Sequence, residues 1–192
     1  MDTTDAPPPQ GSPLRLGIEQ VLTPIATALA VIGGVVLMMV GILTVYSIIG
    51  RALPDGIPLL GWWEPVRGNF ELVELGTAIG IFSFLPYTHL KRGNVLVDFF
   101  TLKASPRAKA ALAVFANLLY SGIVLLFTWR MAVGTGEIMT ASYTQTTMLL
   151  RIPIWYGYLP TTLFMVFLSV VALYSVWRSL EEALGPGEPR KA

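Results

Sequence analysis

The sequence predicts an all-α membrane protein with four transmembrane helices. Of its 192 residues, 54% are hydrophobic and only 13% are charged, whereas a soluble domain carries about 25% charged residues. Three stretches contain no Asp, Glu, Lys or Arg, namely Gln20–Gly50, Ala110–Trp129 and Ile152–Trp177. Because roughly 20 apolar residues cross a bilayer core, each stretch can supply one span. A fourth, less apolar segment lies between the first two stretches.

The four spans are placed at about 22–50, 70–90, 108–131 and 155–179, in a single membrane domain over residues 14–182. The first span is longer than a bilayer core requires, so we expect it to tilt strongly or to project beyond the bilayer. The second span is the least apolar, because Glu71 and Glu74 lie at its start and Pro86 lies near its end. It crosses the membrane only if its first turn lies at the membrane surface.

Short amphipathic segments and two tails complete the predicted architecture. Residues 14–22 and 94–102 mix apolar and polar side chains, which favours segments that lie on the cytoplasmic surface of the membrane. The Thr-rich segment 136–150 is expected to fold against the outer face. The Pro-rich residues 1–13 are predicted to form a disordered tail, and residues 183–192 a solvated one. The acidic N-terminus is unlike a signal peptide, so we expect the first span to remain as an anchor.

The distribution of basic residues predicts the orientation, because Lys and Arg near span ends favour the cytoplasm. With four spans, the two tails and the connection between the second and third spans share one side. That side carries nine basic residues: Arg15, Lys91, Arg92, Lys103, Arg107, Lys109, Arg178, Arg190 and Lys191. The other side carries four: Arg51, Arg67, Arg130 and Arg151. We therefore expect both termini to be cytoplasmic.

The composition argues against several classes of function. The absence of cysteine removes disulfides, thiolate metal sites and cysteine nucleophiles. His89 is the only histidine, so we expect no metal or cofactor and no enzymatic activity. We interpret His89 as an interfacial residue rather than a ligand or proton relay. The balance of 13 basic and 12 acidic residues argues against a nucleic-acid partner.

Glu74 is the first candidate for a functional role, because ionisable groups inside a span often serve transport. Glu71 lies at the boundary of the same span and is interpreted as interfacial. Glu74 lies one turn deeper, and two readings remain open for it. It could be a structural or partner-facing carboxylate, or the coupling carboxylate of a self-sufficient four-helix exporter that acts as a homodimer.

Small residues recur at helical spacing and predict close contact between helices. Thr27, Gly34 and Gly41 lie at seven-residue intervals in the first span, and Gly76 and Gly80 form a small-xxx-small pair in the second. Asn117, Ser121 and Thr128 form a mildly polar stripe on the third span. These patterns favour tight packing over a substrate cavity, and they predict a scaffold that contacts a helix-rich partner.

Five short segments follow one another in a distinctive order: Phe-Glu-Leu-Val-Glu-Leu (70–75), Phe-Leu-Pro-Tyr (84–87), Lys-Arg-Gly-Asn-Val-Leu-Val-Asp-Phe (91–99), Ser-Pro-Arg (105–107) and Leu-Arg-Ile-Pro-Ile-Trp (150–155). In these segments and their spacing, the chain resembles the small membrane subunit of tripartite ATP-independent periplasmic (TRAP) transporters, the DctQ-like family. The resemblance extends over about residues 22–180. Glu74, Gly93, Val97 and Asp98 match the family's pattern at the second span and after it. Pro153 and Trp155 match its pattern at the start of the fourth.

The resemblance implies a function and a set of partners. The small subunit of such a transporter braces a large permease subunit, which performs sodium-coupled uptake of an organic acid anion. A periplasmic binding protein delivers that anion, and the complex lies in the bacterial inner membrane among lipids. The small subunit has no catalytic residues. The candidate interface or structural residues are then Gly34, Gly41, Glu74, Gly76, Gly80, Asp98, Pro153 and Trp155.

Overall fold

The computed structural model describes residues 13–52, 66–91, 106–141 and 143–184, and the structural statements below concern these residues. They form four long helices: α1 (Pro13–Ala52), α2 (Asn69–Leu90), α4 (Pro106–Thr140) and α5 (Trp155–Leu184). Each helix is long and apolar enough to cross a membrane. The structure confirms the predicted all-α class with four membrane-spanning helices.

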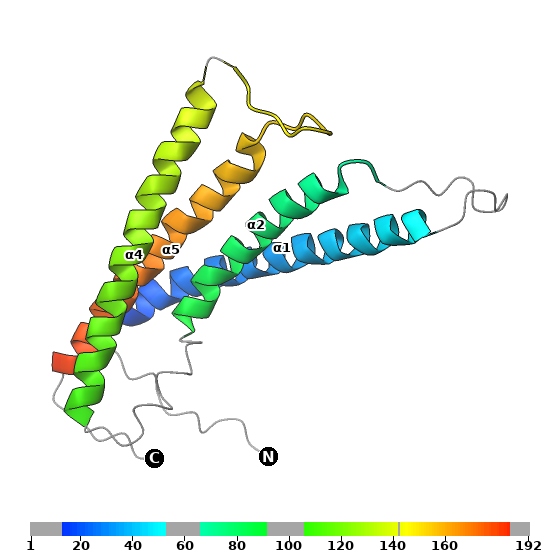
Figure 1. The fold of residues 1–192 in the computed structure, drawn as a ribbon. Helices are drawn as coiled ribbons and strands as arrows, with labels where there is room; N and C mark the ends of the chain where they lie inside the picture. Colours follow the sequence, from blue (N-terminus) through cyan, green and yellow to red (C-terminus); the bar gives the residue numbers. More distant parts are fainter. Residues whose placement is uncertain (1–12, 53–65, 92–105, 142, 185–192) are drawn as a thin grey trace, which may run out of the picture.

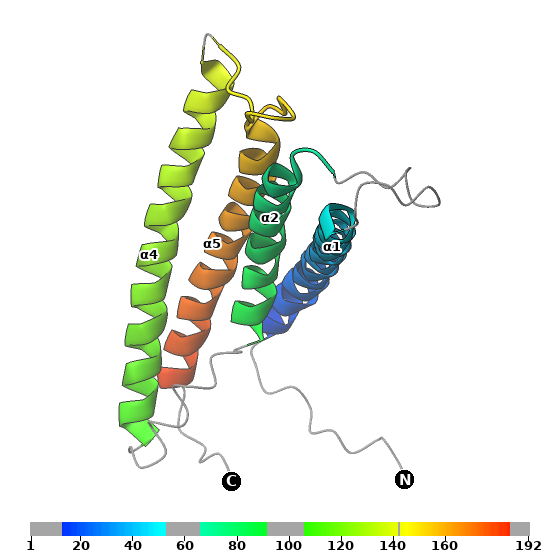
Figure 2. The same ribbon diagram turned by 45° about the vertical axis from the view of Figure 1, so that its right-hand side comes forward.

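The helices form an open row in the order α1, α2, α5, α4. Extensive contacts join α1 to α2, α2 to α5, and α5 to α4, and α1 makes no comparable contact with α4. Figure 2 shows this order, with α2 and α5 in the middle and α1 and α4 at the edges. In Figure 1 the helices converge at the end where α1 begins and separate toward the opposite end. The four helices therefore do not close into a bundle.

Helices that follow one another along the chain run in opposite directions. The first turns of α1 therefore lie at the same end of the row as the last turns of α5, and the two are in contact there. We call this the base of the row. A cluster of buried residues from α1, α2 and α5 fills it: Leu22, Ala26, Leu90, Val171 and Tyr174. A second cluster joins α4 to α5 through Val124, Met165, Leu168 and Ala172. Both clusters contain residues of α5. As a result, 44% of the most apolar 18-residue stretch of α5 is buried, whereas only 6% of the corresponding stretch of α1 is buried.

Three helices are longer than their predicted spans. α1 begins at Pro13 and includes residues 14–22, which the sequence predicted as a separate surface segment. The helix continues because its early charged residues pair with α5, as described below. α4 continues to Thr140, so it includes the first residues of the segment expected to be a loop. α5 likewise continues to Leu184. The predicted segment 94–102 and most of both tails lie outside the described residues.

Candidate partner-binding face and the contacts that support it

Glycines allow α1 and α2 to approach closely. A Cβ at Gly76 would clash with Val40, and a Cβ at Gly80 would clash with Leu37. At Gly33, a Cβ would clash with Ser83 and would lie 2.9 Å from the carbonyl oxygen of Gly80. The structure therefore places Gly76 and Gly80 in a contact within this chain.

The buried stripe on α1 lies one residue away from the predicted one. Ala26, Gly33, Val40 and Ser47 follow one another at seven-residue intervals on the side of α1 that is buried or half-buried. Thr27 and Gly41, from the predicted stripe, are exposed, and a Cβ at Gly41 would meet nothing within 4 Å. Gly34 is half-buried and lies near Phe84. The sequence did not distinguish Gly33 from Gly34, because both are glycines and each belongs to a set of positions spaced seven residues apart.

Hydroxyl groups connect α4 to α5 across their interface. The hydroxyl oxygens of Thr128 and Ser169 lie 2.8 Å apart, as do those of Thr135 and Thr162. Nearer the base, the Asn117 side-chain amide donates to Ser179 Oγ at 3.2 Å. The predicted stripe of Asn117, Ser121 and Thr128 thus packs inside the subunit. Such hydrogen bonds compensate polar groups that lipid could not solvate.

A cluster of charged residues closes the base of the row between α1 and α5. Arg15 lies 3.1 Å from Glu182, and Arg178 lies 3.1 Å from Glu19. Arg15 and Arg178 also pair within their own helices, with Glu19 at 3.7 Å and Glu182 at 3.4 Å. The Tyr174 hydroxyl donates to Glu19 at 2.8 Å. This base cluster was not foreseen, although the i,i+4 spacing of both pairs was visible in the sequence.

Glu71 and Glu74 have different surroundings although they lie one turn apart on α2. The Glu71 carboxylate accepts hydrogen bonds from the backbone N–H groups of Leu149 and Leu150, at 2.7 and 2.9 Å. Glu74 is exposed, and it makes no hydrogen bond or ion pair with any other described residue. Glu71 therefore has a structural role within the chain, and Glu74 is available to another molecule.

The exposed side of α2 is the candidate partner-binding face. Phe70, Glu74, Ile81 and Thr88 are all exposed, and the last three lie at seven-residue intervals. We call them the Glu74 face. Phe70 is 71% exposed and Ile81 is 51% exposed. The Arg51 guanidinium lies 5.5 Å from the centroid of the Phe70 ring. A carboxylate on a surface that faces lipid is costly unless a cation or water compensates it. The face therefore suits a helical partner that brings a basic group opposite Glu74.

The other described residues that the sequence singled out do not lie on the Glu74 face. Pro153 pairs with Thr146 in an isolated β-bridge just before α5, and Trp155 begins α5 and stacks on Tyr156 with ring centroids 4.2 Å apart. Asp98 lies outside the described residues. His89 is buried and stacks on Tyr120 with ring centroids 4.2 Å apart.

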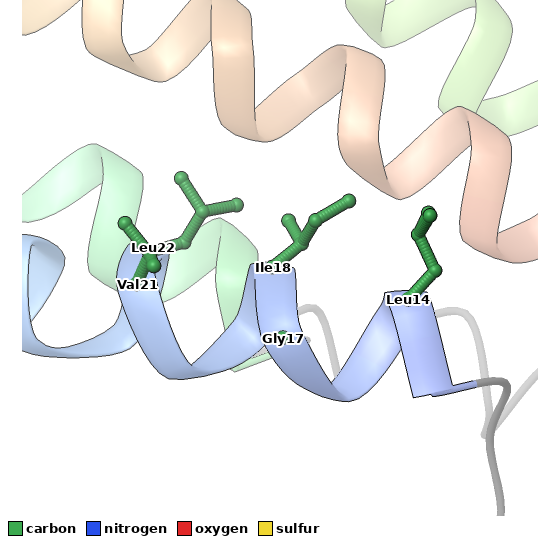
Figure 3. Close-up of a pocket in the computed structure, with 5 residues that line it drawn as sticks. All are labelled: Leu14, Gly17, Ile18, Val21 and Leu22. Atoms are coloured by element: carbon green, nitrogen blue, oxygen red, sulfur yellow. The ribbon is translucent and has the colours of Figure 1, made fainter.

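Two surface hollows are lined by α1 alone and contain no charged side chain. One is lined by Leu14, Gly17, Ile18, Val21 and Leu22, and Figure 3 shows Leu14 and Ile18 pointing toward the neighbouring helix α5. The other is lined by Met38, Gly41, Ile42, Val45, Tyr46 and Ile49. Within the described ranges, no group of three or more His, Asp or Glu side chains could hold a metal ion.

Comparison with known families identifies a related family. A family model described as the DctQ component of tripartite ATP-independent periplasmic transporters matches residues 40–182. The match covers the last part of α1, all of α2 and α4, and nearly all of α5. Comparisons with curated proteins and with solved structures gave no match.

Proposed function

This chain belongs to the DctQ component family of TRAP transporters, and from that premise we propose that it is a small scaffold subunit that braces a large permease subunit. As a family member with four spanning helices, it is a multi-pass protein of the inner membrane. The proposal assigns substrate binding and ion coupling to the large subunit. It assigns no catalytic step to this chain.

The observation that carries the proposal is the contrast between the polar groups that pair with each other within this chain and Glu74, which does not. Two pairs of hydroxyls join α4 to α5, and the charges at the base pair across α1 and α5. Glu71 is bonded to the backbone near the start of α5. Glu74 alone of the two glutamates on α2 has no partner among the described residues. An unpaired carboxylate on an exposed side of a spanning helix favours a partner subunit with a complementary cation.

The resemblance to the family supports the finer parts of the proposal. The complex takes up an organic acid anion with sodium, and a periplasmic binding protein delivers that anion. Both termini and the connection between α2 and α4 lie in the cytoplasm, in keeping with the excess of Lys and Arg on that side.

The alternative is a self-sufficient homodimeric exporter that uses Glu74 to couple transport to a cation. Its support is that Glu74 is a carboxylate within a span. A coupling carboxylate must exchange its cation with both sides of the membrane, which requires a polar route past it. Glu74 lies near one end of α2, on an outer surface of the row. That position favours the scaffold.

Purification and reconstitution test the scaffold proposal. The chain, co-expressed with its large permease subunit, should co-purify with it at one-to-one stoichiometry. Liposomes that contain the complex and the binding protein should take up the anion, and liposomes that contain this chain alone should not. Sodium- or proton-driven transport by the chain alone would contradict the proposal.

The cysteine-free sequence offers a direct test of orientation. Single cysteines at Ser12, Asp55, Ser105 and Ser142 can be exposed to a membrane-impermeant reagent in cells with a permeabilised outer membrane. Positions 55 and 142 should react, and positions 12 and 105 should react only after the inner membrane is opened. Labelling at position 105 in closed cells would reverse the assigned orientation.

A further inference from the structure

The loop before α5 is a small hairpin over residues 145–154 whose backbone is largely satisfied by hydrogen bonds. Thr147 N–H donates to the Ile152 carbonyl at 2.9 Å, and Ile154 N–H donates to the Gln145 carbonyl at 3.0 Å. Ile152 N–H donates to the Thr147 hydroxyl at 3.0 Å. The strand-like pairing is closed by the bridge between Thr146 and Pro153.

The start of α2 fixes the tip of this hairpin. Glu71 accepts the N–H groups of Leu149 and Leu150, which the hairpin itself leaves free. Leu150 packs over Gly68, where a side chain could not fit, since a Cβ there would clash with Leu150. Gly68 also has a φ of 74°, a conformation that favours glycine. Figure 1 shows the hairpin extending from α5 toward the start of α2.

The fixed tip presents apolar side chains outward. Met148 is 96% exposed and Leu149 is 70% exposed, and Tyr143, just before the hairpin, is 72% exposed. Exposed apolar side chains on a flexible loop would be unremarkable. Here, however, five backbone N–H groups between 147 and 154 are bonded while the side chains at the tip remain uncovered. Irregular backbone must be satisfied in this way before it can enter a poorly hydrated region.

We propose that Met148 and Leu149 insert into the lipid leaflet at the end of the row where α2 begins, so that the hairpin anchors this end of α2 and α5 in the membrane. Trp155, Tyr156 and Tyr143 lie beside the hairpin in the sequence, and such aromatic residues favour the membrane interface. Arg151 is exposed at the tip, and an arginine side chain beside an inserted segment can extend its charged head toward lipid phosphate groups. The inserted surface is only two side chains, far smaller than the roughly 800 Å² that each partner buries in a stable protein interface. Lipid is therefore the occupant. The inference depends neither on which leaflet is cytoplasmic nor on the scaffold function.

Fluorescence quenching at the tip tests the insertion. Met148→Cys, labelled with an environment-sensitive nitrobenzoxadiazole probe, is placed in phosphatidylethanolamine–phosphatidylglycerol liposomes, either alone or in the complex. The matched control is Thr144→Cys, which is also exposed but lies before the hairpin. Lipids with a nitroxide at carbon 5 should quench the probe at 148 several-fold more than the probe at 144, and aqueous iodide should do the reverse.

Two results would overturn the proposal. Equal iodide quenching at 148 and 144 would place the tip in water. Lipid quenching that is present for the chain alone and lost in the complex would assign the tip to the large subunit. In the chain alone, Glu71→Ala should increase iodide quenching at 148 because it releases the tip, and Glu74→Ala, one turn away, should leave it unchanged. Unchanged quenching in the Glu71 variant would show that the carboxylate does not fix the tip.

Discussion

The two helix pairs at the edges of the row are held together in different ways. Between α1 and α2, glycines bring the backbones together, and the hydroxyls of Thr44 and Ser83 bond to carbonyls of their own helices. Between α4 and α5, hydroxyls bond across the interface at Thr128 and at Thr135. The first pair therefore depends on shape and the second on shape plus hydrogen bonds. A single added side chain should harm the first pair much more than the loss of a hydroxyl harms the second.

The comparison extends to the base of the row. α1 is the least buried helix and packs mainly on α2, and its direct link to α5 is confined to the base. There the base cluster joins α1 to α5 through ion pairs. α1 is thus held by two kinds of contact, the glycine contact with α2 along its length and the ion pairs with α5 at its start. The variants below test these two contacts and the α4–α5 hydrogen bonds one at a time.

The largest effect is expected for Gly33→Leu. The new side chain meets Ser83 and the backbone of Gly80, and backbone cannot move aside as a flexible side chain can. Overpacking of this kind costs about 3 kcal/mol. The measurement is the free energy of unfolding in mixed micelles titrated with dodecyl sulfate. Gly41→Leu, on the same helix with open space around its Cβ, is the control and should be neutral. Equal losses of unfolding free energy in both variants would show that the glycine contact does not cause the loss in Gly33→Leu.

An intermediate effect is expected for Glu19→Gln at the base. The substitution weakens the pair with Arg178 and the hydrogen bond from Tyr174. Because the side chain is 31% exposed, water and salt screen the pairs, and the loss should be about 1 kcal/mol. The loss should shrink in high salt. A loss that does not change with salt concentration would mean that packing, not charge, is responsible.

The smallest effect is expected for Thr135→Val. It removes the hydroxyl bonded to Thr162 and leaves the shape of the side chain almost unchanged. Hydrogen bonds between membrane helices contribute about 0.6 kcal/mol on average. Thr140→Val is the control, because Thr140 bonds to the Gly136 carbonyl of its own helix and is exposed. A loss at Thr135 as large as that of Gly33→Leu would remove the distinction between the two helix pairs.

The sequence predicted the class of fold, the number of spans and their approximate positions, because long uncharged stretches are a local property. It could not predict where the helices end. α4 continues to Thr140 because its contact with α5 continues as far as Thr135 and Thr162, which depends on the partner helix. The buried register of α1 was also ambiguous, since it depends on which of two adjacent glycines meets Ser83.

The candidate site was predictable only in part. Glu74 was identified by its charge within a span, and the structure leaves it exposed. Glu71 was interpreted as merely interfacial, and its contact with the hairpin was missed. Its bonding partners lie more than 70 residues further along the chain, so no local pattern could reveal them. Long-range polar contacts of this kind require the folded arrangement.

The central claim is that Glu74 is a structural or partner-facing carboxylate rather than an ion-coupling one. Glu74→Gln removes the charge and keeps the shape of the side chain. The measurement is anion uptake per assembled complex in liposomes, with assembly quantified on the same samples. We predict that the yield of complex falls or stays the same, and that uptake per complex remains at the wild-type value. A complex that assembles fully and transports nothing would contradict the account, because it would make Glu74 a coupling residue.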